Sequence, residues 1–328
     1  MGRFDPPLVT SMTPPTKEEL DAAFCWEADD EIPRRPAMAA FRREARYHQA
    51  RWREENHHPI GTQPISPRPG DRVRPVGSRL PLDFARDTGA NFLTSAALDA
   101  ARARTAYIEA RQSFDHQRLW ADLLSSSALS FNLFGDLAAD LARADRAVHR
   151  WFPDAPGRVS GMWFAHSPGW LDPAYLHSLR SFDTVFTLDL DDGSCGFVAV
   201  NVKYHERNKG EIPKPENHAL YGKIAERSGA FAPGAIETLK GRSDLCVLWL
   251  EHLLMFSMLQ HPSDNRTWGR YLVVHPAGNS DVVDLCSRYR TMLADETTFT
   301  TMTLEQLLDT GTLPRPTITA LRARYLYM

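Results

Sequence analysis

Lysine is scarce in this chain of 328 residues, in which six of the 38 basic residues are lysines and 32 are arginines. Genomic base composition explains much of this bias, but the positions of so few lysines still carry information. Hydrophobic residues make up 43% and charged residues 24% of the chain, which is typical of a soluble folded protein and excludes disordered, collagen-like and coiled-coil chains. The length allows one large domain or two modest ones.

Cysteine is also rare, and the four cysteines, at least 40 residues apart, form no C-x-x-C motif. This spacing argues against a disulfide-stapled scaffold or a zinc site, so we expect reduced thiols in a cytoplasmic protein. The most apolar stretch, residues 245–259, is interrupted by Glu251 and His252 and is too short to span a membrane. It predicts a buried helix, and the lack of a signal-peptide pattern agrees with the expected cytoplasmic location.

Motifs that mark common small-molecule enzymes are absent as well. The chain has no G-x-G-x-x-G, no G-x-x-x-x-G-K-[ST] and no G-x-S-x-G sequence. A dinucleotide-binding, P-loop or α/β-hydrolase function therefore has no support from the sequence.

Positive charge is concentrated between residues 34 and 79, a segment with eleven arginines and only four acids. The local charge of +7 leaves −10 for the rest of the chain, whose total is −3. Within this segment residues 36–55 have helical periodicity, and the spacing of Arg42, Arg46 and Arg53 places them on one face. Such a face suits the phosphate backbone of DNA, yet a solvated arginine-rich helix explains the pattern equally well.

Proline content and hydrophobic periodicity divide the chain into four parts. We predict a disordered tail in residues 1–16, the arginine-rich helix and an extended proline-rich arm in residues 17–81, and a helical region in residues 82–157 that packs on the core. Residues 158–328 form that core, in which short β-branched segments predict strands. The predicted helices of the third part are 94–112, 117–124 and 129–151; the predicted elements of the fourth are strands 159–164, 184–190, 196–203, 271–275 and 298–301, and helices 243–261 and 279–293.

A turn from Asp191 to Ser194 joins the second and third of these strands in a hairpin. Helices come first, then the antiparallel hairpin, and then helices alternate with strands. This order predicts an α/β fold class with a mixed sheet, a central hairpin and flanking helices, preceded by a helical N-terminal region.

Asp183, Asn201 and Lys203 are the strongest candidates for chemistry. Asn201 and Lys203 lie two residues apart on one predicted strand and so point to the same face, and the hairpin can bring Asp183 beside them. Carboxylate and amide oxygens are ligands for Mg²⁺, and a lysine ammonium can orient water and offset charge on a phosphate. A simple surface ion pair at the hairpin edge is the alternative interpretation.

Several segments also carry a family resemblance: residues 181–183 (SFD), 197–206 (FVAVNVKYHE), 123–136 (LLSSSALSFNLFGD), 164–170 (FAHSPGW) and 275–279 (HPAGN). Together they resemble the PD-(D/E)XK nuclease superfamily, with its restriction-endonuclease-like fold, and more narrowly a bacterial branch of it. The resemblance runs from about residue 40 to residue 308. It implies a nuclease that hydrolyses DNA phosphodiester bonds with Mg²⁺ or Mn²⁺, with Asp183 and Asn201 as metal ligands and Lys203 as the cation that positions water. A homodimer is common among such nucleases.

Two positions depart from the family pattern. Asn201 stands where the second motif of the family has glutamate, and Ala165 stands where an upstream glutamate is expected. Because an amide oxygen binds Mg²⁺ more weakly than a carboxylate does, Glu206 and Glu251 are reserve site candidates, although a paired core group is the favoured interpretation of Glu251. Two functions stay open: a nuclease with a weakened active site, or an inactive relative that has lost its metal and binds DNA or a protein partner.

Overall fold

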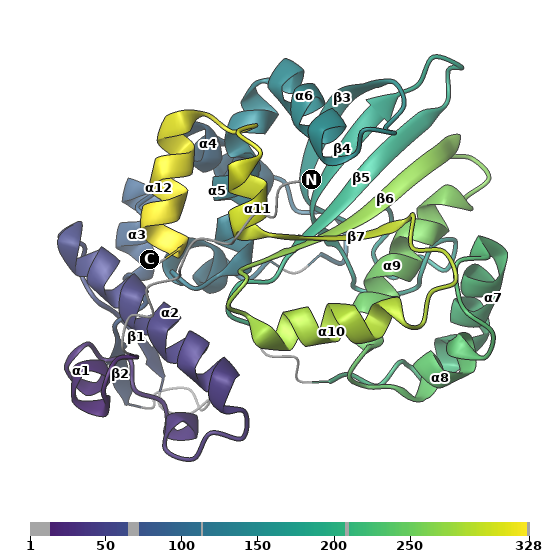
Figure 1. The fold of residues 1–328 in the computed structure, drawn as a ribbon. Helices are drawn as coiled ribbons and strands as arrows, with labels where there is room; N and C mark the ends of the chain where they lie inside the picture. Colours follow the sequence, from purple (N-terminus) through teal and green to yellow (C-terminus); the bar gives the residue numbers. More distant parts are fainter. Residues whose placement is uncertain (1–13, 65–71, 113, 207–209, 327–328) are drawn as a thin grey trace, which may run out of the picture.

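A five-stranded mixed sheet forms the centre of the structure, a computed structural model that describes residues 14–64, 72–112, 114–206 and 210–326 (Figure 1). Neighbouring strands follow the order β3-β4-β5-β6-β7, antiparallel from β3 to β5 and parallel from β5 to β7. Their bounds are β3 Arg158–His166, β4 Phe182–Asp189, β5 Cys195–Val202, β6 Arg266–His275 and β7 Phe299–Thr303. The predicted α/β class with a central hairpin is confirmed. Residues 1–13 of the predicted tail lie outside the described residues.

The central strand β5 is buried on both faces because its residues alternate between two apolar clusters. Val198, Val200 and Val202 join one cluster, whereas Phe197 and Ala199 join the other. This period of two is the geometry of a strand. It places the end of β5 inside the protein, where a polar side chain needs a partner.

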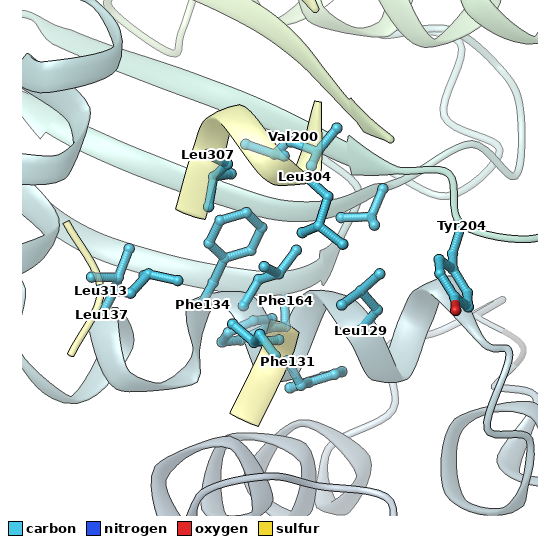
Figure 2. Packing of buried hydrophobic residues seen from close by; sticks show 14 of the residues in the cluster. Leu129, Phe131, Phe134, Leu137, Phe164, Val200, Tyr204, Leu304, Leu307 and Leu313 are labelled. Atoms are coloured by element: carbon cyan, nitrogen blue, oxygen red, sulfur yellow. The ribbon is translucent and has the colours of Figure 1, made fainter. Parts of the chain in front are cut away.

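Helices cover both faces of the sheet (Figure 1). One face carries α5 (Ser126–Ala139), α6 (Leu141–Trp151), α11 (Leu304–Asp309) and α12 (Arg315–Tyr325). Figure 2 shows Phe134 of α5 and Leu307 of α11 packed beside Val200. The other face carries α7 (His218–Ser228), which η3 (Pro215–Asn217) directly precedes, α8 (Ala235–Gly241), α9 (Cys246–Leu259) and α10 (Ser280–Arg290). None of the helices in the described part of the chain is long and apolar enough to cross a membrane.

The N-terminal part packs against the closing helix α12. Its elements are α1 (Lys17–Ala22), η1 (Ala28–Asp30), α2 (Pro36–Glu55), β1 (Gly61–Pro64), β2 (Val73–Val76), α3 (Leu82–Thr88) and α4 (Ser95–Ala106). Helix α2 has the predicted bounds, whereas part of the predicted arm pairs as two antiparallel strands, β1 and β2. Gln49 Nε2 of α2 donates to Arg324 O over 2.7 Å and to Tyr204 Oη over 3.4 Å. Helix α2 is therefore fastened both to α12 and to the segment that follows β5.

Several helix predictions differ from the structure, and the helix predicted over residues 94–112 ends at Ala106. Residues 129–151 belong to two helices rather than one, because Asp140 ends α5 and caps α6 through a 3.0 Å hydrogen bond from Arg143 N. Residues 117–124 contain one π-helical turn, η2 (Gln117–Ala121). The sequence does not predict α7 and α8, because each buries only a few side chains of a mostly polar stretch. The division of the chain into four parts stays a prediction.

Gly135 of α5 allows a close approach of α4. A Cβ atom at this position would lie 2.5 Å from Ala97 Cα and 2.7 Å from Ala97 N. We expect Gly135→Ala to lower the free energy of unfolding, measured by chemical denaturation, by about 1–3 kcal/mol, because the two helices would have to move apart. Gly241→Ala in α8 is the control, since its Cβ would meet no described packing neighbour within 4 Å. Equal stability of the two variants would contradict this expectation.

Candidate active site

A pocket of about 340 Å³ opens where β4 begins and β5 ends. It contains Asp183, Asn201 and Lys203, the three residues that the sequence predicts to lie together. Strand geometry and the hairpin are enough to bring them into one pocket, but their chemical roles stay predictions. Charged and polar side chains from other segments complete the wall, among them Arg118, Ser126, Arg180, Glu206 and Glu251.

Asp183 and Asn201 are joined across the β4–β5 pair by two hydrogen bonds. Asp183 N donates to Asn201 Oδ1 over 3.2 Å, and Val202 N donates to Asp183 Oδ2 over 2.7 Å. Burial raises the pKa of the Asp183 carboxyl group to about 6, although Lys203 and the Val202 N–H group favour the charged form. Asn201 is buried as well, so the hairpin holds both side chains in place.

Lys203 forms an ion pair with Glu251 of α9. Its Nζ donates to Glu251 Oε1 over 2.7 Å, while Tyr271 Oη donates to Glu251 Oε2 over 2.5 Å. Burial opposes the charge of Lys203, but Glu251 and Asp183 outweigh it and raise the pKa of the lysine. The two interpretations of Glu251 are therefore compatible: it is a paired buried group and also part of the pocket wall.

Glu206, the other reserve candidate, supports the segment that follows β5. Its Oε1 accepts from Arg118 Nη2 over 2.5 Å and from Ser126 Oγ. Its Oε2 accepts from the backbone N–H groups of Tyr204 and His205 over 2.7 and 3.1 Å. Both oxygens are thus in use, and the carboxylate links this segment to η2 and to the first turn of α5.

The two histidines near the candidate residues are neutral. His252 is fully buried between Tyr289 Oη and Thr298 Oγ1, each 3.0 Å away, and burial lowers its pKa to about 3. Burial, helped by the charge of Arg46, also lowers the pKa of His205 to about 3. His252 is therefore a satisfied core group.

Ala165, where the family pattern has an acid, takes a structural position at the end of β3. Its backbone φ is 46°, and its carbonyl oxygen accepts from Arg104 Nη2 over 3.0 Å. No carboxylate is supplied at this position, whereas the acid that pairs with Lys203 is Glu251 of α9.

The prediction that Arg42, Arg46 and Arg53 share one face of α2 is confirmed, but the expectation that this face is open to a phosphate backbone is wrong. The three side chains are 8%, 2% and 7% exposed. The buried carboxylate of Asp30, the half-buried carboxylate of Glu27 and carbonyl oxygens of neighbouring segments bind this face. Arg46 pairs with Asp30 and Glu27 and donates to Cys25 O. Arg53 donates to Gly77 O and to His58 O. Arg42 pairs with Glu27 and donates to His205 Nε2.

The oxygens of Asp183 and Asn201 suit Mg²⁺ in kind. Within the described ranges Asp183 accepts one hydrogen bond, on Oδ2, and a carboxylate has lone pairs on both oxygens. Across the described ranges, no three His, Cys, Asp or Glu side chains are grouped closely enough to hold a metal ion by themselves. Mg²⁺ commonly uses one or two carboxylates and completes its shell with water and substrate phosphates. The residues therefore fit a cation that is shared with a substrate.

Because its carboxyl pKa is raised in the folded state, Asp183 lowers stability when it is charged. The unfolded value is 3.8 and the folded value about 6, so this cost develops as the pH rises from about 4 and is complete above about 6. We expect Asp183→Asn to increase the free energy of unfolding at pH 7.5 by about 1–3 kcal/mol, with no gain at pH 4. Thermal unfolding at both values checks this, with Asp189→Asn at the exposed end of β4 as control. A lower melting temperature for Asp183→Asn at pH 7.5 would contradict it.

The fold and the pocket define an α/β protein with a carboxylate and a lysine at one end of a β-hairpin. A family model described as the PD-(D/E)XK nuclease superfamily matches residues 35–327. The chain belongs to this superfamily, as its sequence motifs predict, and the membership supports a nuclease-like function. Comparisons with curated proteins and with solved structures found no match.

Proposed function

We propose that this protein hydrolyses phosphodiester bonds of DNA with Mg²⁺ or Mn²⁺ as cofactor. The observation that carries the proposal is the ammonium of Lys203, which lies in the same pocket as Asp183 and Asn201. One of six lysines in an arginine-rich chain stands here, at the end of a buried strand. Membership of a nuclease superfamily supports this reaction.

The proposed mechanism divides the work among three side chains. Asp183 and Asn201 would hold the cation through their oxygens, and a bound cation would supply Lewis-acid charge. Lys203 orients the attacking water or binds a phosphate oxygen, and it offsets the negative charge that develops as the new P–O bond forms and the bond to the leaving oxygen breaks. The water loses its proton to bulk solvent, and the leaving oxygen takes a proton from bulk solvent. Since Glu251 and Asp183 raise the pKa of Lys203, the lysine acts as a cation and not as a general base.

Two arginines of the pocket wall support a polyanionic substrate. Arg118 and Arg180 line the same pocket as Lys203. Each is paired with an acid, Glu206 and Glu211 respectively, which keeps the guanidinium groups in place. The guanidinium groups of Arg118 and Arg180 would contact the phosphates on either side of the cleaved bond.

The alternative function is an inactive nuclease-fold protein that binds DNA or a protein partner. The arginine face of α2, which the sequence suggested as its binding surface, is not available for this role. Arg42, Arg46 and Arg53 are used inside the chain. What still favours this alternative is the neutral side chain of Asn201, which leaves Asp183 as the only carboxylate of the predicted ligand pair. A DNA cleavage assay distinguishes this alternative from the nuclease.

The assay uses the purified full chain on supercoiled plasmid, linear duplex and single-stranded DNA, with Mg²⁺, Mn²⁺ or a chelator. We expect metal-dependent cleavage that the chelator and Asp183→Ala both abolish, whereas Asp189→Ala, outside the pocket, cleaves normally. Equal cleavage by wild type and Asp183→Ala would reveal a contaminating nuclease and refute the proposal. No cleavage by any version, together with salt-dependent DNA binding, would favour the binding protein.

A further inference from the structure

A chain of three polar side chains from different elements leads away from the pocket. Lys203 follows β5, Glu251 belongs to α9 and Tyr271 belongs to β6. Lys203 Nζ donates to one oxygen of Glu251 over 2.7 Å, and Tyr271 Oη donates to the other over 2.5 Å. Both carboxylate oxygens are therefore fixed, one by the lysine and one by the tyrosine.

The stability of the fold does not account for this charged pair. The side chain of Glu251 is 5% exposed and that of Lys203 17%, so both charges have lost most of their water. Burying a charge costs several kcal/mol, and apolar residues of similar volume are often as stabilising as a buried ion pair. Apolar residues occupy most of the surrounding helix, and another apolar residue at position 251 would avoid the cost.

A lysine needs an anchor to keep its ammonium in one place. Its four-carbon stem is flexible, and its three N–H donors bind water readily. The bond to Glu251 uses one donor and leaves two for other acceptors. Tyr271 in turn immobilises Glu251, because the tyrosine is fully buried. The ring of Tyr271 lies 6.1 Å from that of Phe182 and 5.8 Å from that of His252, measured between centroids.

We propose that Glu251 and Tyr271 are positioning residues that hold the Lys203 ammonium at a fixed point beside Asp183. The inference rests on the proposed function, in which this ammonium meets the reacting phosphate. Asn201 is neutral, so the carboxylate that orients Lys203 comes from α9, 48 residues further along the chain. The rigid Tyr271 prevents that carboxylate from following the lysine toward solvent.

Three variants test this inference by separating kcat from KM. We expect Glu251→Gln to lower kcat about 100-fold and Tyr271→Phe about 10-fold, because a catalytic group displaced by about 1 Å loses much of its effect; KM should change little. Tyr289→Phe is the matched control. Tyr289 is equally buried, and its hydroxyl contacts His252 instead of Glu251. A merely structural role would lower the melting temperature of both tyrosine variants and leave both kcat values unchanged.

A second measurement does not depend on cleavage. Ammonium protons held in a hydrogen bond exchange slowly with water, so a ¹H–¹⁵N NMR signal from Lys203, assigned by its loss in Lys203→Met, reports the contact. We expect this signal in wild type and Tyr289→Phe, and its loss in Glu251→Gln and Tyr271→Phe.

An unchanged signal or an unchanged kcat in Glu251→Gln overturns the positioning role, even if the wild type cleaves DNA as proposed. If the wild type cleaves none of the substrates, the proposed function fails. The positioning role then fails with it, and a signal that behaves as expected would show only a structural contact.

Discussion

Lys203→Met is expected to lower the rate of DNA cleavage at least about 100-fold while DNA affinity changes little. In the proposed mechanism the ammonium of Lys203 stabilises charge that accumulates on the phosphate in the transition state. A group that acts mainly in the transition state affects kcat more than substrate binding. Single-turnover cleavage of a linear duplex, with the protein in excess, measures the effect directly, and a binding assay without metal measures affinity.

The control variants separate this loss from unfolding. Lys203→Met leaves Glu251 buried without its cation, which by itself lowers stability. The double variant Lys203→Met/Glu251→Gln removes that unpaired charge, so it should regain stability without regaining cleavage. Lys223→Met, on an exposed position of α7, should behave like wild type. Cleavage by a folded Lys203→Met protein at the wild-type rate would exclude the proposed role of the lysine.

Arg46→Met is expected to lower the free energy of unfolding by about 3 kcal/mol, because it removes the closer of the two arginines that pair with the buried carboxylate of Asp30, the other being Arg43. Arg46 is 2% exposed and pairs with Asp30, which is 3% exposed. It also donates to Cys25 O over 2.9 Å and thereby ties α2 to the segment before η1. Urea denaturation, followed by circular dichroism, measures the loss.

Arg51→Met on the same helix is the comparison. The Arg51 side chain is 52% exposed and, among the residues that the structure describes, pairs with Glu54 and Glu55 at the surface, so its removal should change stability by less than about 1 kcal/mol. The two variants therefore distinguish an internal arginine from a solvated one. If Arg46→Met folded as stably as wild type but bound DNA less tightly, the result would support phosphate binding by the arginine face of α2.

Local sequence patterns were sufficient to predict the strands and the turn that form the candidate site. The β-branched residues of 196–203 predict β5, and a period of two places Asn201 and Lys203 on the same face. The turn at residues 191–194 predicts the hairpin that brings Asp183 to them. Local patterns do not predict short helices such as α7 and α8, because packing on the sheet stabilises these helices more than their own amphipathic pattern does.

The arginines of α2 illustrate why spacing alone does not give function. A three- and four-residue spacing predicts a shared face for Arg42, Arg46 and Arg53, but not whether that face meets solvent or other residues. Glu27 and Asp30 determine that the face is buried, since their carboxylates pair with the arginines and offset the cost of removing these charges from water. Nothing in the spacing of the arginines indicates these partners.

The sequence by itself determined the α/β class, the hairpin and the common direction of Asn201 and Lys203, because turns and strand periodicity depend on residues that are close in the chain. Only the tertiary structure decided that Glu251 pairs with Lys203, that Glu206 binds Arg118, and that Arg46 is buried with Asp30. These pairs are separated by 48, 88 and 16 positions in the sequence. A charged residue can pair with any opposite charge that packing brings near it, so the choice of partner is made only when distant segments fold together.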